Sequence, residues 1–366
     1  MKIGILTVPF NNNYGGFLQA FALKHLLVRM GHEVIFINRQ RNKKIPSFKY
    51  RVLVFPYYYI KNLRAKYRQN IISKYTNVFK KHYLEPFTEE YFSTTKLKEC
   101  LKYKFDAVVV GSDQVWRYKY AKDSIDDFFC DFLEGTEIKH IAYAASIGTD
   151  EQEYPEDKLK RCSDLLKSFS AISVRETGGK NLLVRDFGML DSEVSVVLDP
   201  TLLLSKDVYV ELFKDYAQDK TKYIFTYVLD KNEAKKTLIK NVCDKIGLME
   251  VSMSAQTGNV SEVDHIEPVE LWLSRLYHSD FVVTDSFHGA VFSILFNKPF
   301  LVMGNSERGS SRFDCLLNTF ELKNRYIEDL NSDVKSIIDA EIDWENVNQL
   351  ISHNAKSSYE FLKSNL

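Results

Sequence analysis

The chain repeats one pattern along most of its length: a short apolar run of strand length ends in a few small polar residues, and a helical stretch follows. In the first part of the chain these runs are MKIGILTV, HEVIFINRQ, FDAVVVGSDQVW, HIAYAASIG, AISVRE and VSVVLDPTLL. Apolar runs with little alternation are typical of strands that are buried on both faces of a parallel sheet. Because helical stretches separate them, the sequence predicts an α/β fold with a doubly wound sheet.

The pattern starts again after Asp199-Pro200. Strand-like runs TKYIFTYVL, LMEVSMS, DFVVTDSFHGA and KPFLVMG alternate with helical stretches KNEAKKTLIKNVCDKIG, PVELWLSRLYHS and VFSILFN. We therefore expect a Rossmann-like N-terminal domain at residues 1–212, a smaller Rossmann-like domain at 213–340, and a helix at 341–366 that returns to the first domain. Two such domains that face each other across a cleft form a GT-B-like architecture.

Composition excludes several classes of protein. The chain has 366 residues, is 45% hydrophobic and has a formal net charge of zero, so it can bury two cores and gives no indication of a nucleic-acid partner. Five scattered cysteines form no CxxC motif and have no histidine at metal-ligand spacing, so we expect neither a disulfide framework nor a metal site. Without a signal peptide or a long apolar segment, the sequence favours a cytoplasmic protein.

The segment 39–82 differs from the rest of the chain. From Arg39 to Lys81 there are 13 Lys or Arg residues and no acid, interleaved with aromatic residues such as FPYYY, whereas Asp123 to Asp157 has 11 acids and one lysine. Such a basic, aromatic segment is suited to contact with an anionic membrane surface or a lipid-phosphate acceptor. The simpler interpretation is an exposed helical excursion whose charge is balanced by the acidic segment.

Polar residues follow the predicted strands where they end. Because the carboxyl ends of parallel strands lie at one edge of a sheet, these residues are expected to face one crevice: Asn13, Ser112, Asp113, Ser146, Arg175 and Glu176. In the first of these loops, NNNYGG, glycine lets the backbone approach a ligand and the following helix offers free N–H groups. The alternative is an ordinary turn in which Asn and Gly tolerate left-handed geometry. No GxGxxG motif supports a dinucleotide site.

The densest motif is VVTDSFHGAVFSILFNKPF. A strand is expected to end at Thr284, Asp285 or Ser286 to cap the next helix, and His288 and Gly289 to lie in its first turn. There an imidazole can donate or accept a proton, while the helix N-terminus attracts a phosphate or carboxylate. The alternative is a histidine that is simply packed at the start of a helix.

Six motifs in this order resemble the polysaccharide pyruvyltransferase family: NYGGFLQAFAL, GSDQVW, YAASIG, SVRE, LDPTLLL and TDSFHGAVFSILFNKPF. The resemblance spans residues 4 to about 315. It implies a GT-B-like fold, phosphoenolpyruvate as donor, a cell-surface sugar as acceptor, possible lipid linkage of that sugar, and a pyruvate ketal as product. It also implies bacterial cell-envelope or exopolysaccharide synthesis, without a cofactor.

One position departs from the family pattern. Family members often carry an arginine two residues before the motif histidine, and this chain has Ser286 there. The positive charge that binds the donor must then come from elsewhere. Arg175 of SVRE is the first candidate, because its planar fork can hold an oxyanion. Arg312, in the loop GNSERGSSRFDCLL, is the second, unless it is a surface arginine on a mobile loop.

The resemblance and the motifs together give each candidate a role. His288 transfers a proton, and Asp285 orients it. The donor is expected at Arg175, Arg312, Ser286 and the helix start at Gly289. Glu176 is a rival base or the ion-pair partner of Arg175. The acceptor side is expected to contain Asn13, Tyr14, Gly15, Gly16, Gln19, Ser112, Asp113 and Glu176.

Two other functions remain open at this point. A GT-B glycosyltransferase that uses a nucleotide sugar would have the same fold, because fold alone does not fix function. The chain contains no Asp-x-Asp pair of the kind that holds a divalent ion on a sugar nucleotide. The other possibility is a non-catalytic glycan-binding relative, to which the Ser286 substitution is relevant.

Overall fold

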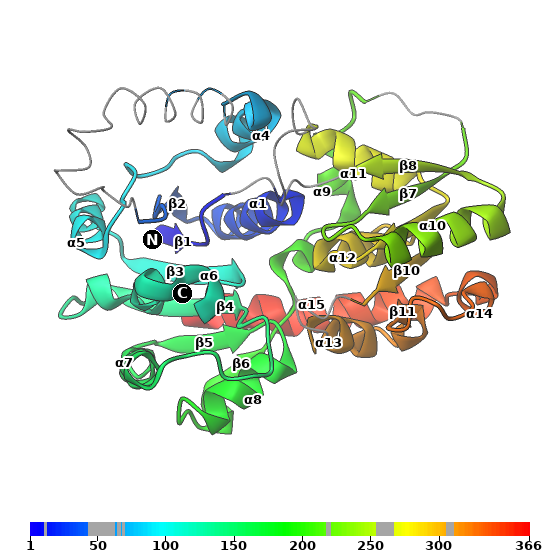
Figure 1. The fold of residues 1–366 in the computed structure, drawn as a ribbon. Coiled ribbons are helices and arrows are strands. Elements are labelled where there is room, and N and C mark those ends of the chain that lie inside the picture. Colours follow the sequence, from blue (N-terminus) through cyan, green and yellow to red (C-terminus); the bar gives the residue numbers. More distant parts are fainter. Residues whose placement is uncertain are drawn as a thin grey trace, which may run out of the picture.

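The computed structural model describes residues 1–10, 13–42, 63, 67, 70–216, 221–253, 267–304 and 311–366. It contains two parallel sheets that lie side by side (Figure 1). We call the part around the first sheet the N-terminal unit and the part around the second sheet the C-terminal unit. The α/β class with two parallel sheets, predicted from the sequence, is confirmed.

The N-terminal unit has a six-stranded sheet in the order β2-β1-β3-β4-β5-β6. Its strands are β1 Lys2–Leu6, β2 Glu33–Phe36, β3 Ala107–Asp113, β4 Lys139–Ala145, β5 Ala171–Val174 and β6 Val194–Val196. Ile3 pairs with Val34 on one side and with Ala107 on the other, which places β1 between β2 and β3. Each run that the sequence analysis assigned to a strand in this part forms one.

The C-terminal unit has a five-stranded sheet in the order β11-β10-β9-β7-β8. Its strands are β7 Tyr223–Tyr227, β8 Met249–Met253, β9 Phe281–Thr284, β10 Phe300–Met303 and β11 Tyr326–Ile327. All four pairings are parallel. Helices join consecutive strands, as the alternation in the sequence predicts.

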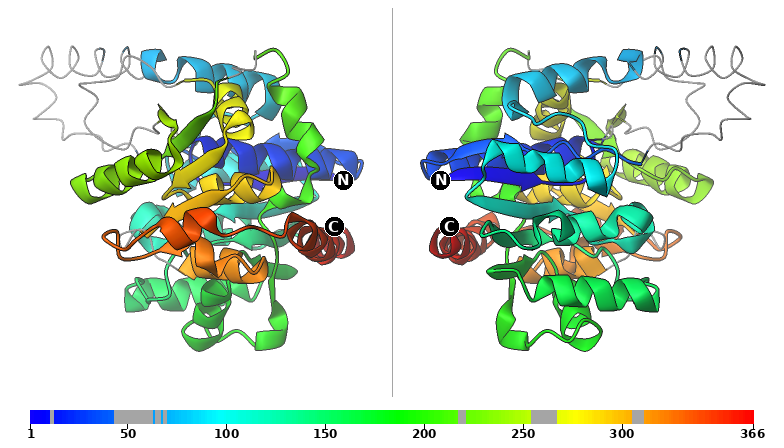
Figure 2. Two further views of the ribbon diagram at one scale, coloured as in Figure 1. Left: turned by 90° about the vertical axis from the view of Figure 1, so that its right-hand side faces the viewer. Right: turned by 90° about the vertical axis from the view of Figure 1, so that its left-hand side faces the viewer.

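Helices surround both sheets (Figures 1 and 2). The α-helices are α1 Tyr14–Arg29, α4 Lys74–Phe79, α5 Thr94–Leu97, α6 Tyr118–Ala121, α7 Glu156–Leu166, α8 Thr177–Arg185, α9 Lys206–Leu212, α10 Glu233–Ile246, α11 Val269–His278, α12 Phe287–Leu295, α13 Ser311–Thr319, α14 Lys335–Asp339 and α15 Trp344–Asn365. Shorter helical turns are η1 Lys80–Leu84, η2 Lys98–Tyr103, η3 Lys122–Phe129, η4 Asp131–Leu133, η5 Asp191–Glu193, η6 Pro200–Leu203 and η7 Lys323–Arg325.

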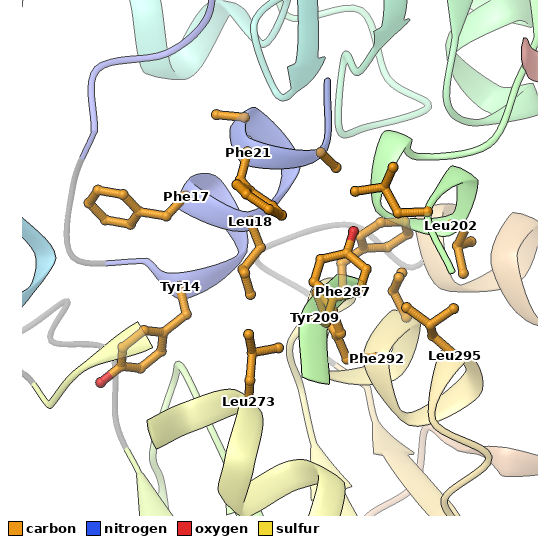
Figure 3. Packing of buried hydrophobic residues seen from close by; sticks show 14 of the residues in the cluster. Tyr14, Phe17, Leu18, Phe21, Leu202, Tyr209, Leu273, Phe287, Phe292 and Leu295 are labelled. Atoms are coloured by element: carbon orange, nitrogen blue, oxygen red, sulfur yellow. The ribbon is translucent and has the colours of Figure 1, made fainter. Parts of the chain in front are cut away.

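Helix α1 is almost free of charged residues because it is buried between the two units. Its apolar side chains Tyr14, Leu18 and Phe21 lie close to side chains of α11, α9 and α12 (Figure 3). Asn13 caps the helix by accepting a hydrogen bond from the Gly15 N–H, at 3.1 Å. Gly31, with φ of 88°, follows its last turn, as the sequence predicts. A helix in the middle of a core needs this all-round apolar surface.

Helix α15 runs from the C-terminal unit back along the N-terminal unit (Figure 1). The backbone N–H of Leu198 donates to Ser358 Oγ at 2.9 Å. The rings of Tyr143 on β4 and Phe361 lie 6.3 Å apart. The last helix therefore holds the strand-end loop that precedes Asp199.

Most of the basic, aromatic segment lies outside the described residues. Of 39–82, the structure describes Arg39–Asn42, Leu63, Tyr67 and residues 70–82. In the described part, α4 is anchored by Phe79, whose ring contacts those of Phe17 and Phe21 on α1. None of the described helices is long and apolar enough to cross a membrane.

Candidate active site

A cavity of about 300 Å³ lies between the two units. In the N-terminal sheet the chain reverses its direction of winding between β1 and β3, and in the C-terminal sheet between β7 and β9. Open α/β sheets bind ligands at such reversals, outside the carboxyl ends of the strands. The loops at both reversals line this cavity, together with a few neighbours: Val8, Pro9, Phe10, Asn13, Gly16, Arg39, Gln40, Arg41, Asp113, Gln114, Tyr120, Ala121, Ser124, Phe128, Leu229, Asp285, Ser286, Phe287, His288 and Arg312.

Two helix N-termini face the cavity, one from each unit. Asn13 caps α1, and Ser286 caps α12 through a hydrogen bond from the Gly289 N–H to its Oγ, at 3.3 Å. Helix N-termini attract anions because of their free N–H groups and the helix dipole. Ser286 therefore has the capping position that the sequence analysis gave to it or to Asp285.

His288 lies in the first turn of α12, and only 4% of its surface is exposed. Its Nε2 is 3.4 Å from Asp199 Oδ2. The ring also packs against the start of α1: a Cβ added to Gly15 would lie 2.1 Å from His288 Nδ1. Gly15 is therefore needed so that the imidazole of one unit can lie against the helix of the other.

Asp199 is the centre of this contact between the units. Its Oδ2 accepts hydrogen bonds from Arg175 at 2.8 Å and from Ser112 Oγ at 3.3 Å, beside His288. Its Oδ1 accepts from the N–H and the hydroxyl of Thr201, at 3.1 and 2.7 Å. Burial alone raises the pKa of Asp199, but His288, Arg175 and Thr201 outweigh it and hold the pKa well below its usual range.

Arg175 connects three carboxylates at the ends of the N-terminal strands. Besides Asp199, its guanidinium lies 3.6 Å from Glu176 and 3.8 Å from Asp113, and it stacks on the Phe287 ring at 4.1 Å. Burial lowers the pKa of Arg175, but the three carboxylates outweigh it, so the pKa is raised. Arg175 is absent from the cavity lining; it contacts the lining residues Asp113 and Phe287 from behind. The sequence analysis expected it to bind the donor directly.

The orienting role that the sequence analysis gave to Asp285 needs correction. Its Oδ1 accepts from the Leu229 N–H at 2.6 Å, and its Oδ2 accepts from the Asp230 N–H at 3.1 Å and from Lys235 Nζ at 2.6 Å. These bonds tie the ends of β9 and β7 together. Among the described residues, the carboxylate paired with His288 is that of Asp199. The sequence feature that could have indicated Asp199 is its position directly after a predicted strand, in VSVVLDPTLL.

The expected acceptor residues divide into two groups. Asn13, Gly16 and Asp113 line the cavity, whereas Tyr14, Gly15, Gln19, Ser112 and Glu176 support it from behind.

Each of the supporting residues has its own partners. Tyr14 packs against both Tyr227 and Trp272 and donates to the Glu267 carbonyl at 3.1 Å. Gln19 donates to Thr7 Oγ1 at 3.3 Å. Glu176 accepts a hydrogen bond from the hydroxyl of Ser146 at 2.5 Å and forms an ion pair with Arg175. The ion pair is one of the two roles expected for Glu176; the other is that of a base.

Arg312 is the arginine of the expected donor set that lines the cavity. It lies in the first turn of α13, 6% exposed, and its guanidinium is 5.8 Å from the Phe287 ring. Burial and the nearby Arg175 lower the pKa of Arg312 to about 10, so it stays a cation at neutral pH. Gly289 does not line the cavity; a Cβ there would lie 2.3 Å from Thr284 Oγ1, so this glycine permits close packing of α12 on β9.

The sequence analysis missed the rim residues Arg39, Gln40 and Arg41 as cavity residues, because it assigned them to the basic segment. Arg39 is bound to Asp127 at 2.5 Å and is 2% exposed. Among the described residues, no group of three or more His, Cys, Asp or Glu side chains is arranged to hold a metal ion.

Comparison with known proteins gives two kinds of similarity. A family model described as polysaccharide pyruvyl transferase matches residues 13–307. No curated protein matches the sequence significantly.

Several solved structures share the fold. UDP-GlcNAc 2-epimerase from Neisseria meningitidis, bound to UDP-GlcNAc, has a TM-score of 0.57 at 11% identity, covering 100% of this chain and 99% of that chain. The enzyme from Methanocaldococcus jannaschii, with UDP-GlcNAc and UDP, has a TM-score of 0.53 at 13% identity and 99% coverage of both chains. Arabidopsis thaliana UGT89C1, complexed with UDP-L-rhamnose, has a TM-score of 0.53 at 10% identity, covering 99% and 97%. At such identities the similarity establishes the GT-B fold alone.

Proposed function

The chain belongs to the polysaccharide pyruvyl transferase family, a family of transferases, and on this basis we propose that it transfers the enolpyruvyl group of phosphoenolpyruvate to two hydroxyls of a sugar. The product is a cyclic pyruvate ketal, and phosphate is released. The observation that carries this proposal is the cavity between the units, where His288, Arg312 and the N-termini of α1 and α12 meet. It combines a proton-transfer group with positive potential, which a small donor with a carboxylate and a phosphate requires.

The reaction begins with protonation of the methylene carbon of phosphoenolpyruvate, which makes C2 an electrophile. His288 provides this proton. Asp199 orients the imidazole through its Nε2, in the place first assigned to Asp285, and its own position is fixed by Arg175, Ser112 and Thr201. A buried carboxylate with a low pKa stays negative throughout the cycle and so stabilises the protonated imidazole.

The negative groups of the donor are bound by Arg312 and by the start of α12 at Ser286–His288, which lines the cavity. Arg312 lines the cavity together with Phe287 and His288. It therefore takes the place of the arginine that family members often carry at the position of Ser286. Its planar fork is suited to a carboxylate or a phosphate. Arg175 acts from behind by fixing Asp199 and Asp113.

The acceptor lies toward the N-terminal unit, near Asn13, Gly16 and Asp113. We propose a polysaccharide or a lipid-linked sugar, used in bacterial cell-envelope or exopolysaccharide synthesis on the cytoplasmic side. Arg41 lines the cavity at the start of the basic segment, so a phosphate-bearing lipid carrier at the membrane face would approach from this rim.

The proposal is tested with His288→Ala and a matched control, His353→Ala, which changes an exposed histidine of α15. Both proteins and the wild type are incubated with phosphoenolpyruvate and a panel of p-nitrophenyl hexosides, and phosphate release and ketal formation are followed. Loss of a general acid lowers the rate by roughly 10² to 10⁴, so we expect such a loss in His288→Ala alone. Activity of His288→Ala within about tenfold of the wild type would remove the assigned role.

A further inference from the structure

Asp113, the last residue of β3, has an unusual backbone conformation at the cavity. Its φ is 76°, in the left-handed region, which is uncommon for non-glycine residues, although Asn and Asp adopt it more readily than others. Such conformations carry an energetic cost and are concentrated at functional sites, where the surrounding structure maintains them. We therefore expect this conformation of Asp113 to have a functional reason.

The neighbouring strands explain how the conformation is maintained. A Cβ added to Gly111 would lie 2.0 Å from the Tyr143 carbonyl oxygen, so β3 and β4 approach each other closely there. The next residue of β4, Ala144, also has a positive φ, 49°, and the pairing of β4 with β5 shifts register between Ala142 and Ala145. Irregularities of this kind at strand ends redirect side chains next to active sites.

The Asp113 carboxylate is free to receive a substrate hydroxyl. Among the described residues its carboxylate accepts no hydrogen bond; its charged neighbours are Arg175, at 3.8 Å, and Arg312, which also lines the cavity. Its side chain is 17% exposed and lines the cavity. The other acids nearby differ: Asp199 and Asp285 are saturated by protein donors, at 1% and 0% side-chain exposure.

The two adjacent glycines at the start of α1 place Asp113 in relation to His288. A Cβ on Gly15 would meet the His288 ring at 2.1 Å, and a Cβ on Gly16 would meet Asp113 Oδ2 at 4.0 Å. The imidazole and the carboxylate therefore both lie against the first turn of this helix. They are also joined through Arg175, which bonds Asp199, the partner of His288, with one nitrogen and faces Asp113 with another.

We infer that Asp113 is the second proton-transfer residue of the reaction, the base that accepts the proton of the attacking sugar hydroxyl. This inference rests on the proposed function. It follows from a carboxylate without protein donors, held in a strained conformation at the side of the cavity where the acceptor is placed. One acid and one base at different positions are what the addition of a hydroxyl across a protonated enol requires.

The proton transfers balance over one cycle. Protonated His288 gives its proton to C3 of phosphoenolpyruvate; the first hydroxyl oxygen bonds to C2, and its proton moves to Asp113. The bond from C2 to the phosphate oxygen then breaks, the electron pair stays on phosphate, and the phosphate takes the proton from Asp113. The second hydroxyl oxygen bonds to C2 and closes the ketal, and its proton returns to His288. Both side chains end as they began.

Two substitutions test the role without disturbing the backbone. Asp113→Asn keeps the shape, and Asn tolerates a positive φ; Asp113→Gly removes the side chain at a φ that glycine adopts freely. The control, Asp157→Asn, changes an exposed aspartate of α7 that does not line the cavity. Phosphoenolpyruvate binding is measured by calorimetry, and ketal formation with p-nitrophenyl hexosides is measured separately.

We expect Asp113→Asn and Asp113→Gly to bind phosphoenolpyruvate as the wild type does and to lose ketal formation by roughly 10²- to 10⁴-fold. Added formate should restore part of the activity of Asp113→Gly, which a purely structural role would not allow. If Asp113→Asn retains activity within about tenfold while His288→Ala loses it, the role of Asp113 is overturned and the proposed function stands. If the wild type neither binds phosphoenolpyruvate nor releases phosphate, both fail.

Discussion

At the scale of single residues, the neighbouring glycines Gly15 and Gly16 have different physical roles. A side chain on Gly15 would occupy the space of the His288 ring, whereas one on Gly16 would make an ordinary contact with Asp113. Both lie in α1, so exchange to alanine also favours the helix by up to about 1 kcal/mol. At Gly16 the new van der Waals contact and the gain in helix propensity both favour the folded state. At Gly15 the clash with the His288 ring opposes the gain in helix propensity.

We therefore expect Gly15→Ala to lower the free energy of unfolding by about 1 to 3 kcal/mol, the usual effect of overpacking. Gly16→Ala should leave it unchanged or raise it by up to about 1 kcal/mol. Urea titration of both variants measures this difference. Equal stabilities would mean that the imidazole moves aside at little cost and is not held against α1.

The low pKa of Asp199 predicts that the free energy of unfolding depends on pH. Its pKa is lower in the folded protein than in the unfolded chain, so its contribution is fully present above about pH 4, the ordinary pKa of aspartate, and is lost as the pH falls below it. Breaking a buried ion pair costs about 3 to 5 kcal/mol. Asp199→Asn should therefore be destabilised by about this amount at pH 7.

The difference between Asp199→Asn and the wild type should narrow by about 1 kcal/mol at pH 3. Ser112→Ala is the control, because Ser112 carries no charge itself and donates to the same carboxylate oxygen. Loss of this hydrogen bond to an ionised group should cost about 1.5 to 3 kcal/mol at either pH. Unfolding at pH 7 and pH 3 measures both variants. A difference for Asp199→Asn that does not change with pH contradicts the assignment of the low pKa.

Residue identity predicted several side chains that line the cavity, but not the pairing among them. His288, Arg312, Asp113 and Asn13 follow strands and line the cavity, and strand ends are visible in the sequence. The sequence indicates Asp285 as the partner of His288 because it lies only three positions earlier in the chain. Asp199 instead collects donors from residues 24 and 87 positions away, and such long-range pairing depends on packing that no local pattern records.

At the scale of elements, strands and helices were predicted well because each carries a strong local signal. Gly31 and Gly247 both have a positive φ at a helix end, a conformation that glycine adopts freely. Helix α1 shows the limit of such signals: its low content of charged residues is visible in the sequence, but the surface that buries it is not. That surface is the other unit, as the contacts in Figure 3 show.

The packing of helix α15 against the N-terminal unit leads to a prediction about the stability of the fold. Leu362 is completely buried, and Ser358 accepts a hydrogen bond from Leu198, the residue before Asp199. We expect Leu362→Ala to lower the free energy of unfolding by about 2 to 5 kcal/mol, through lost burial and the cavity that it leaves. The exposed neighbour Lys363→Ala should change it by less than about 0.5 kcal/mol. Similar losses in both variants would show that α15 does not depend on this contact.

At the scale of the whole molecule, the two units meet through a core and through the buried contact between His288 and Asp199, and the cavity lies between them. A ligand in that cavity contacts residues of both units, so it stabilises the folded chain by an amount that follows from its concentration and Kd. At a free concentration of 100 times Kd, this amounts to about 2.7 kcal/mol. The identity of the ligand that has this effect distinguishes a pyruvyl transferase from an enzyme of the same fold that uses a nucleotide sugar.

We expect phosphoenolpyruvate to raise the thermal unfolding midpoint of the wild type, and UDP and GDP to leave it unchanged. Arg312→Ala should lose this response, because it removes the lining cation that lies near the Phe287 ring, to which the binding of the donor is assigned. Arg185→Ala, which changes an exposed arginine of α8 outside the lining, should retain it. Stabilisation by UDP or GDP without stabilisation by phosphoenolpyruvate would instead assign the cavity to a nucleotide sugar. The positive charge at Arg312 and the helix starts would then bind a diphosphate, since the same electrostatics serves either anion.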